Sequence, residues 1–302
     1  MTVANGPQSL RCWWSAPADW EHDITNISLI NRVYIVLPEV FGVNDWVRSV
    51  ADRLAAQGIP ALAVPLFSRT APELELAYKT SDLAQGRIHK DATTASQILS
   101  DVSAAVAWLQ QRCPGAAIDL VGFCFGGHAA LLAATLPQIR HSFDFYGAGV
   151  SCMRPGGGAP SLELLPQVPG QLTCLCGTAD PLIPEQDRRA IRSGLAAAEP
   201  SGERLRYIEI NGVDHGFSCA ARDRFDVDAS ALGGRRMRAE ACGAATLAAV
   251  GRGGAGMVRT ALVGAASFSS FFTNGVLRGV WNMIMLRPSR LGACWISAFS
   301  SR

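Results

Sequence analysis

The first 215 residues alternate between short apolar runs and segments in which apolar residues recur at helical spacing. Short apolar runs bounded by turn-forming residues are typical of buried strands, and a helix between two such runs is the usual crossover between parallel neighbours. The alternation therefore predicts an α/β fold, with one mostly parallel central sheet and helices on both faces. The predicted strands are 33–37, 61–64, 118–121, 141–146, 172–176 and 205–210. Predicted helices begin near residues 46, 98, 128 and 184.

Acidic residues disappear from the sequence after residue 240. Residues 1–240 contain all 25 acidic residues and 21 of the 27 basic ones, whereas residues 241–302 contain six Arg, no Lys and no acid. Gly, Ala, Ser and Arg dominate the last segment, and no helical period organises its apolar residues. We therefore expect one domain over 1–240. Over 241–302 we expect a poorly ordered extension or the product of a shifted reading frame.

Charge and chain ends exclude several classes of protein. A net charge of +2 is too balanced for a general nucleic-acid-binding surface. The N-terminus has no basic segment followed by an apolar one, so we expect no signal peptide and a cytoplasmic location. The uncharged stretch 260–277 reaches the minimum length of a membrane span, but it contains Gly, Ser, Thr and Asn. We therefore expect no membrane partner. The oligomeric state stays open.

Nine cysteines are scattered singly along the chain, without the density of a disulfide scaffold. This usage favours a reducing compartment. Cys174 and Cys176 lie on one face of a predicted strand, which indicates core packing rather than a metal site. No phosphate-binding loop of the P-loop or Rossmann type is present. We expect neither a metal nor a cofactor.

A glycine-flanked cysteine is the first candidate functional residue. The segment GFCFG at 122–126 joins a predicted strand to a predicted helix, in the manner of the G-x-S-x-G turn that carries a nucleophilic serine. Glycines are needed because a Cβ atom in so tight a turn would clash with backbone. Cys124 would also lie at a helix N-terminus, which favours a thiolate. The alternative is a buried structural cysteine.

Two later residues complete a triad in the chain order nucleophile, acid, histidine. Asp180 follows the strand 172–176, and His215 follows the strand 205–210, so both would lie at the carboxyl ends of strands. His215 would carry the thiol proton to the leaving group, and Asp180 would hold the imidazole. Asp214 is the competing candidate for the acid, but its side chain would point elsewhere from so close to the histidine. His128, four residues after the cysteine, is expected on the following helix.

The loop after the first long strand supplies a fourth side chain. A carboxylate at Glu39 would lie over the sheet near Cys124. In the α/β hydrolases the second oxyanion donor comes from this loop, and the first is the amide after the nucleophile. We therefore expect the N–H groups of Val40 and Phe125 to form the oxyanion hole. Taken alone, Glu39 would be interpreted as a surface acid.

Four linked motifs, LPEVFGVN, GFCFGG, GTADPLIP and VDHGF, resemble the dienelactone hydrolases, also called carboxymethylenebutenolidases. The resemblance covers about residues 30–222. It implies an α/β-hydrolase fold, no cofactor, and hydrolysis of a small-molecule ester or lactone through a thioester on the cysteine. It also implies that Glu39 interacts with Cys124 and helps to form the thiolate when substrate arrives. A thiol that is neutral at rest would resist oxidation.

Substrate binding departs from the family pattern. Family enzymes hold a substrate carboxylate with arginines, but Cys219 stands four residues after His215. Arg69, Arg87 and Arg222 are candidate substitutes because they lie near the motifs, although each could equally be a solvated charge.

Two other functions remain open. A thiol amidase also uses G-x-C-x-G, but it generally has His-x-Glu where this chain has His215-Gly216-Phe217. A protein without catalysis could retain the fold as a binding or redox-sensing module, with Cys124 as an oxidisable thiol. Acylation of the protein by p-nitrophenyl acetate distinguishes an enzyme from a sensor.

Overall fold

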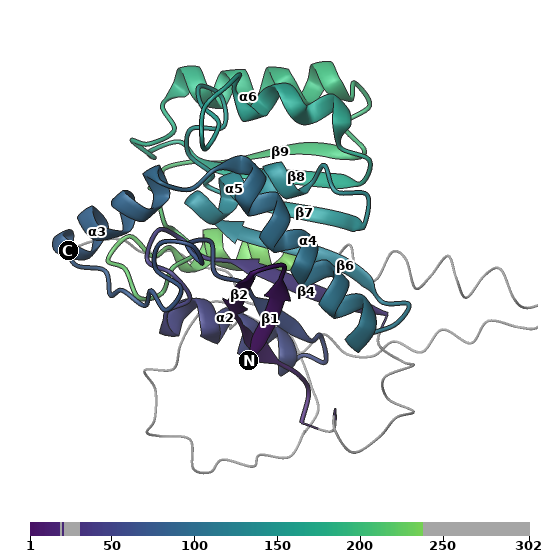
Figure 1. Cartoon of the computed structure of the whole chain (residues 1–302). Helices are drawn as coiled ribbons and strands as arrows, with labels where there is room; N and C mark the ends of the chain where they lie inside the picture. The colour runs from purple at the N-terminus through teal and green to yellow at the C-terminus, as the bar shows by residue number, and fades with distance from the viewer. Residues whose placement is uncertain (19, 21–30, 238–302) are drawn as a thin grey trace, which may run out of the picture.

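A computed structural model describes residues 1–18, 20 and 31–237 (Figure 1). Seven strands in this part of the chain form one sheet in the order β3-β5-β4-β6-β7-β8-β9. Strand β3 is antiparallel to β5 at one edge, and all other neighbours are parallel. The strands of this sheet are β3 (Trp13–Ser15), β4 (Arg32–Leu37), β5 (Ala61–Ala63), β6 (Ala117–Phe123), β7 (Ile139–Phe145), β8 (Gln171–Gly177) and β9 (Leu205–Ile210). A separate hairpin consists of β1 (Thr2–Asn5) and β2 (Gln8–Arg11).

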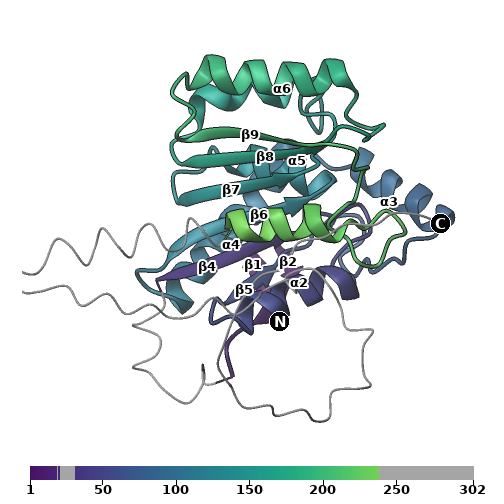
Figure 2. The ribbon, with the colours of Figure 1, turned by 180° about the vertical axis from the view of Figure 1, so that it is seen from behind.

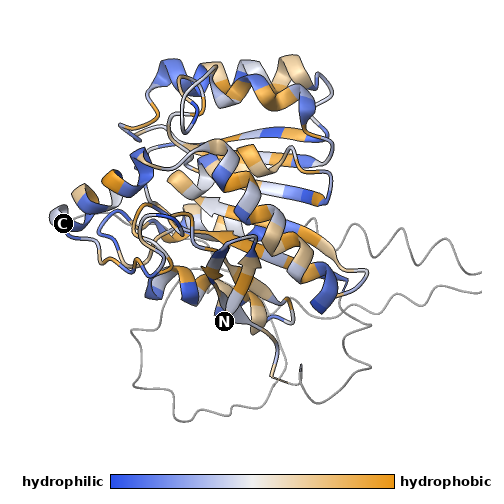
Figure 3. Cartoon of the chain, viewed as in Figure 1, coloured by the Kyte–Doolittle hydropathy of each residue, from blue (hydrophilic) through white to orange (hydrophobic). Residues whose placement is uncertain are grey.

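Helices cover both faces of the sheet, as the turned view makes clear (Figure 2). One face packs against α4 (Ala95–Arg112), α5 (Phe125–Ala133) and α6 (Glu185–Ala198), whose Arg192 lies over the ring of Tyr207 in β9. The other packs against α2 (Asp45–Ala55) and the helical residues 227–237. Figure 3 colours α6 with a mixture of hydrophilic and hydrophobic residues, of which Ile191 and Leu195 are buried. The predicted α/β architecture with a mostly parallel sheet is confirmed.

All six predicted strands and the four predicted helices are present. The pattern was readable there because the first five of these strands are buried on both faces, and each of these helices is buried along an apolar stripe or completely. Strand β9 is only partly buried, with Leu205 as its one buried residue.

The sequence did not reveal α3 (Thr80–Asp91) or the 3₁₀ helix η1 (Ser161–Gln167). In α3 only Gly86 is buried, so the helix has no apolar stripe to read. A capping hydrogen bond marks the start of this helix: a side-chain oxygen of Asp82 accepts the Lys79 N–H at 3.1 Å. Helix η1 contains Pro166 and lies in a Pro- and Gly-rich segment expected as loop.

The last described helix, 227–237, is fastened to the sheet at its end. Arg32 Nη1 and the Tyr34 hydroxyl both donate to the carbonyl oxygen of Met237, at 3.2 and 3.3 Å. No helix in the described ranges is long and apolar enough to cross a bilayer. The predicted extension 241–302, with the uncharged stretch 260–277, lies outside the described residues.

Candidate active site

The predicted turn carries Cys124 in the left-handed region, with φ 55° and ψ −116°, directly before α5. Both flanking glycines are sterically required. A Cβ on Gly122 would lie 1.8 Å from the carbonyl oxygen of Gly126, and a Cβ on Gly126 would lie 2.4 Å from that of Leu37. The turn therefore holds the thiol at the N-terminus of a helix, in a conformation that its surroundings impose.

The two other predicted triad residues meet at the same edge of the sheet. His215 Nδ1 and Asp180 Oδ2 are 2.8 Å apart, and both side chains are buried. Asp180 is itself fixed, because its Oδ1 accepts the Leu182 N–H at 2.8 Å. The competitor Asp214 bonds the backbone N–H of His215 and pairs with Arg224 instead.

The imidazole of His215 has a strongly perturbed pKa. Burial lowers it, but interaction with Cys124 and then with Asp180 outweighs burial and raises the pKa to about 10. A raised pKa favours the imidazolium, which is the form that stabilises a neighbouring thiolate. Among the described residues, Nε2 of His215 has no hydrogen-bond partner, so this nitrogen is available for chemistry.

Glu39 is fully buried, and Arg222 interacts with both Glu39 and Cys124. Its Oε1 accepts from Arg222 Nη1 at 3.0 Å, whereas its Oε2 has no hydrogen-bond partner in the described part of the chain. The Arg222 guanidinium also lies over the rings of Phe41 and Tyr78, 6.0 and 5.9 Å from their centroids. Glu39 is therefore a held, buried carboxylate and not the surface acid that its loop position alone suggested.

A cavity of about 290 Å³ opens beside the cysteine. Val40, Cys124 and Phe125 all line it, so the two amides expected as oxyanion donors border the same space as the thiol. Helix α3 forms another wall because Gly86 packs against the backbone of Val40, where a Cβ would lie 2.2 Å from the carbonyl oxygen. Its Arg87 is among the lining residues.

The three candidate arginines have different environments. Arg87 lines the cavity, as does Lys90 one helical turn later. Arg222 holds Glu39. Arg69 binds the buried carboxylate of Asp101 at 2.7 Å and is not among the residues that line the cavity.

Two residues of the site environment escaped the sequence analysis. Lys90 lies on the unpredicted α3. Tyr146 is fully buried with its ring against His215, at 5.1 Å between centroids. A tyrosine at the end of a strand carries no sequence signal for this contact, since the histidine is 69 residues away.

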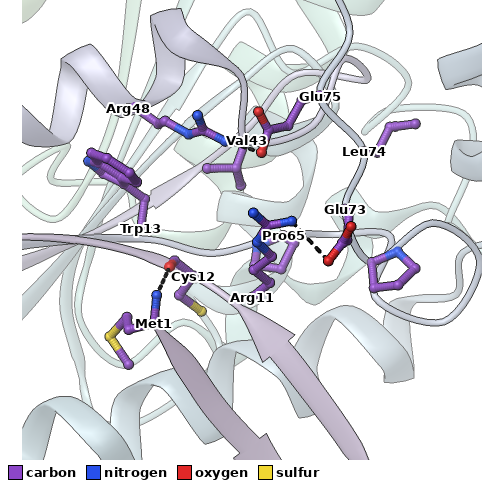
Figure 4. A pocket seen from close by; sticks show the side chains of 11 residues that line it. Met1, Arg11, Cys12, Trp13, Val43, Arg48, Pro65, Glu73, Leu74 and Glu75 are labelled. Carbon is purple, nitrogen blue, oxygen red and sulfur yellow. Dashed lines mark hydrogen bonds and ion pairs between the residues drawn. The ribbon is translucent and has the colours of Figure 1, made fainter.

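A second pocket, of about 240 Å³, lies under the N-terminal hairpin (Figure 4). Its charged side chains neutralise one another: Arg11 pairs with Glu73 at 2.9 Å, and Arg48 pairs with Glu75. Neither the cysteine of the turn nor the histidine lines it. In the described residues, no cluster of three or more His, Cys, Asp or Glu side chains could hold a metal ion.

A parallel sheet with a nucleophile turn between β6 and α5 defines an α/β hydrolase, and solved structures agree on the fold. A crystal structure from Klebsiella pneumoniae, titled "Putative Dienelactone Hydrolase", superposes with a TM-score of 0.61 at 24% identity, over 70% of this chain and 86% of that one. The model of the dienelactone hydrolase family matches residues 28–239. The chain belongs to the dienelactone hydrolase family and is an enzyme of the hydrolase class.

Curated relatives carry consistent names. A Synechocystis sp. protein named "Putative carboxymethylenebutenolidase" is 35% identical over 201 residues, which are 66% of this chain and 80% of the relative. Carboxymethylenebutenolidase from Pseudomonas putida is 26% identical over 218 residues, 68% of this chain and 82% of the relative.

Proposed function

We propose that this chain hydrolyses a carboxylic ester or lactone through a thioester on Cys124, with His215 as the proton carrier and Asp180 as its partner. One observation carries the proposal: the buried 2.8 Å bond between Nδ1 and Asp180 leaves Nε2 without a hydrogen-bond partner among the described residues, and the imidazole interacts with Cys124. A histidine held on one nitrogen and free on the other is suited to moving a proton.

In acylation, the thiolate attacks the carbonyl carbon and forms the C–S bond, while the carbonyl π electrons move to oxygen. The N–H groups of Phe125 and Val40 stabilise this oxyanion. Its collapse breaks the C–O bond, and His215 gives its proton to the leaving oxygen. In a lactone the leaving hydroxyl remains part of the acyl group.

In deacylation, the neutral imidazole of His215 accepts a proton from water as the water oxygen attacks the thioester carbon. The C–S bond then breaks and the carboxylic acid leaves. The sulfur departs as thiolate, so the thiolate and the imidazolium of the starting state are restored. Asp180 keeps its hydrogen bond to Nδ1 throughout and stabilises each imidazolium.

The proposal is tested by trapping the acyl-enzyme. We expect brief exposure to p-nitrophenyl acetate to give a protein with one acetyl group on the peptide that contains Cys124, detected by mass spectrometry after acid quench. A panel of lactones and aryl esters then ranks the substrates. An acetyl group found only on other residues, or none at all with product formed, contradicts a thioester mechanism.

The family resemblance implies a role for Glu39 next to the thiol, and Arg222 keeps the charge of this buried carboxylate compensated. Arg222→Leu should destabilise the fold by about 3 kcal/mol, because it leaves a fully buried carboxylate unpaired. Adding Glu39→Gln should recover most of that loss, since no buried charge then remains. Urea unfolding of the single and double variants measures this coupling. Additive losses in the double variant would show that the two side chains stabilise the fold independently.

Arg87 gives the cavity a preference for substrates with an anionic group. We expect Arg87→Gln to raise the KM of a carboxylate-bearing lactone about tenfold and to leave the kinetics of neutral p-nitrophenyl acetate unchanged, since only the former has a charge to lose. Arg192→Gln, at an arginine of α6 that does not line the cavity, is the matched control. Equal effects on both substrates would remove Arg87 from substrate recognition.

A further inference from the structure

Asp144 is a buried acid beside the nucleophile turn that the proposed mechanism does not use. It lies near the carboxyl end of β7, in register with Gly122 of β6 and Cys174 of β8, and is 2% exposed. Burial raises its pKa to about 7, although hydrogen bonds from the Gly147 amide and from Cys174 lower it. A carboxyl group is unfavourable in such a position unless its oxygens are bonded.

The carboxyl of Asp144 binds the turn that follows its own strand. Oδ1 accepts the N–H of Gly147 at 2.7 Å, in a buried bond. The group is enclosed tightly, because a Cβ on Gly147 would lie 2.3 Å from Oδ1 and one on Gly127 of α5 would lie 2.4 Å from it. The carboxyl is therefore wedged between the start of α5 and the turn 145–148.

His128 of α5 holds the same turn at a second point. Its Nδ1 lies 3.0 Å from the carbonyl oxygen of Ala148, which can only accept, so this nitrogen carries the proton. The Ser161 hydroxyl then donates to Nε2 at 2.7 Å. Burial lowers the pKa of His128 to about 4, which keeps the ring neutral and this pattern of donors unchanged at neutral pH.

Tyr146 lies between these two fixed points in a conformation that a tyrosine rarely adopts. Its φ is 45°, in the left-handed region, and the residue is fully buried. Its backbone N–H donates to the carbonyl oxygen of Leu175 at 2.8 Å. Such a conformation persists only where the surroundings enforce it, and the bonds to Gly147 and Ala148 do so here.

The Tyr146 ring supports the catalytic imidazole. It meets the ring of His215 edge-on, with centroids 5.1 Å apart and planes at 64°, and packs on Phe217 at 5.0 Å. Its hydroxyl has no hydrogen-bond partner among the described residues. The contact with His215 is therefore one of ring packing rather than of hydrogen bonding.

We propose that Asp144 is a positioning residue, which holds the turn 145–148 so that the ring of Tyr146 fixes the imidazole of His215 for proton transfer. The inference rests on the proposed function, because it assigns a support to the histidine of that triad. It adds a link from the core of the sheet to the reacting atoms. Asp144 itself touches neither substrate nor thiol.

Two ester substrates with different leaving groups distinguish a variant in which His215 is misplaced from a variant whose fold is damaged. p-Nitrophenolate leaves without needing a proton, whereas phenolate from phenyl acetate needs one from His215. Since kcat/KM reports acylation alone, the ratio of kcat/KM for the two esters measures the contribution of the general acid. A general loss of structure lowers both values equally.

We expect Asp144→Ala to lower kcat/KM for phenyl acetate about tenfold more than for p-nitrophenyl acetate. Asp144→Asn should restore the ratio, because its side-chain oxygen still accepts the Gly147 N–H. Ser142→Ala, in the same strand, removes an equally buried bond of 2.7 Å to the Ala130 carbonyl and should leave the ratio unchanged. An Asp144→Ala variant that lowers both values by one factor, or neither, overturns the proposal.

Variants of Tyr146 test whether Asp144 acts on His215 through the ring of Tyr146. Tyr146→Phe keeps the ring and should behave as wild type, whereas Tyr146→Leu should reproduce the Asp144→Ala ratio. The double variant of Asp144→Ala and Tyr146→Leu should lose no more than the larger single loss. Additive losses contradict a path through Tyr146. His215→Ala sets the largest possible change in the ratio, and if it changes nothing, the proposed function fails rather than this inference.

Discussion

Replacement of Cys124 by Ala is expected to lower kcat for p-nitrophenyl acetate by about 10⁴-fold or more, the size of loss that follows removal of a covalent nucleophile. The variant keeps the fold because a methyl group occupies the same left-handed position that the surrounding backbone already enforces. Its melting temperature should therefore stay within a few degrees of wild type. Steady-state kinetics and thermal unfolding measure the two quantities on the same sample.

Cys124→Ser is the sharper comparison, because it changes one atom. A serine hydroxyl ionises far less readily than a thiol, and the imidazolium favoured by this site cannot act as its base. We therefore expect the serine variant to stay closer to Ala than to wild type. A serine variant with wild-type rates would show that the site works as an ordinary serine hydrolase site. An Ala variant with more than a tenth of the wild-type rate would exclude Cys124 as the nucleophile.

Alkylation of Cys124 by iodoacetamide is expected to be nearly independent of pH between about 6.5 and 9. This expectation follows from the pKa of His215, which is raised to about 10. The imidazole therefore stays protonated across this pH range, and its positive charge stabilises the thiolate throughout. In His215→Gln that charge is absent, so the thiolate loses its stabilising partner. At pH 6.5 the variant should react at least about tenfold more slowly than wild type, and its rate should rise with pH.

Peptide mapping assigns the alkylated cysteine, and Cys124→Ala supplies the background, since six other cysteines are present in the described residues. Asp180→Asn should shift the profile in the same direction as His215→Gln, because the imidazolium loses its charged partner. A wild-type rate that rises with pH across this range would instead mean a thiol that is neutral at rest. That is the state which the family resemblance implies, and Glu39 would then help to form the thiolate when substrate arrives.

The glycines of the nucleophile turn were readable from the sequence because their requirement is local. The backbone carbonyl that excludes a side chain at Gly122 belongs to Gly126, only four residues away. The spacing of Cys124, Asp180 and His215 was readable for a related reason, since each follows a strand and parallel strands end at one edge. The pairing of Glu39 with Arg222 could not be predicted, because 183 residues separate the two side chains.

Helix α3 shows a second reason why part of the site could not be predicted from the sequence. It carries Arg87 and Lys90 to the cavity, but it has no apolar stripe, and its close approach to Val40 depends on one glycine. A helix with a single buried residue has almost no periodic signature. The walls of the cavity beside Cys124 were for this reason the part of the site that sequence reasoning described least well.

By itself, the sequence determined the α/β architecture, the position of the glycine-flanked turn at Cys124 and the chain order of the triad candidates, because burial and turn geometry act on neighbouring residues and leave periodic patterns. Only the tertiary structure decided what compensates the charge of Glu39, and that Tyr146 and Asp144 stand behind the imidazole of His215. These depend on side chains that are distant in sequence and meet at a buried edge of the sheet, where distance, orientation and burial set the strength of hydrogen bonds and charge interactions.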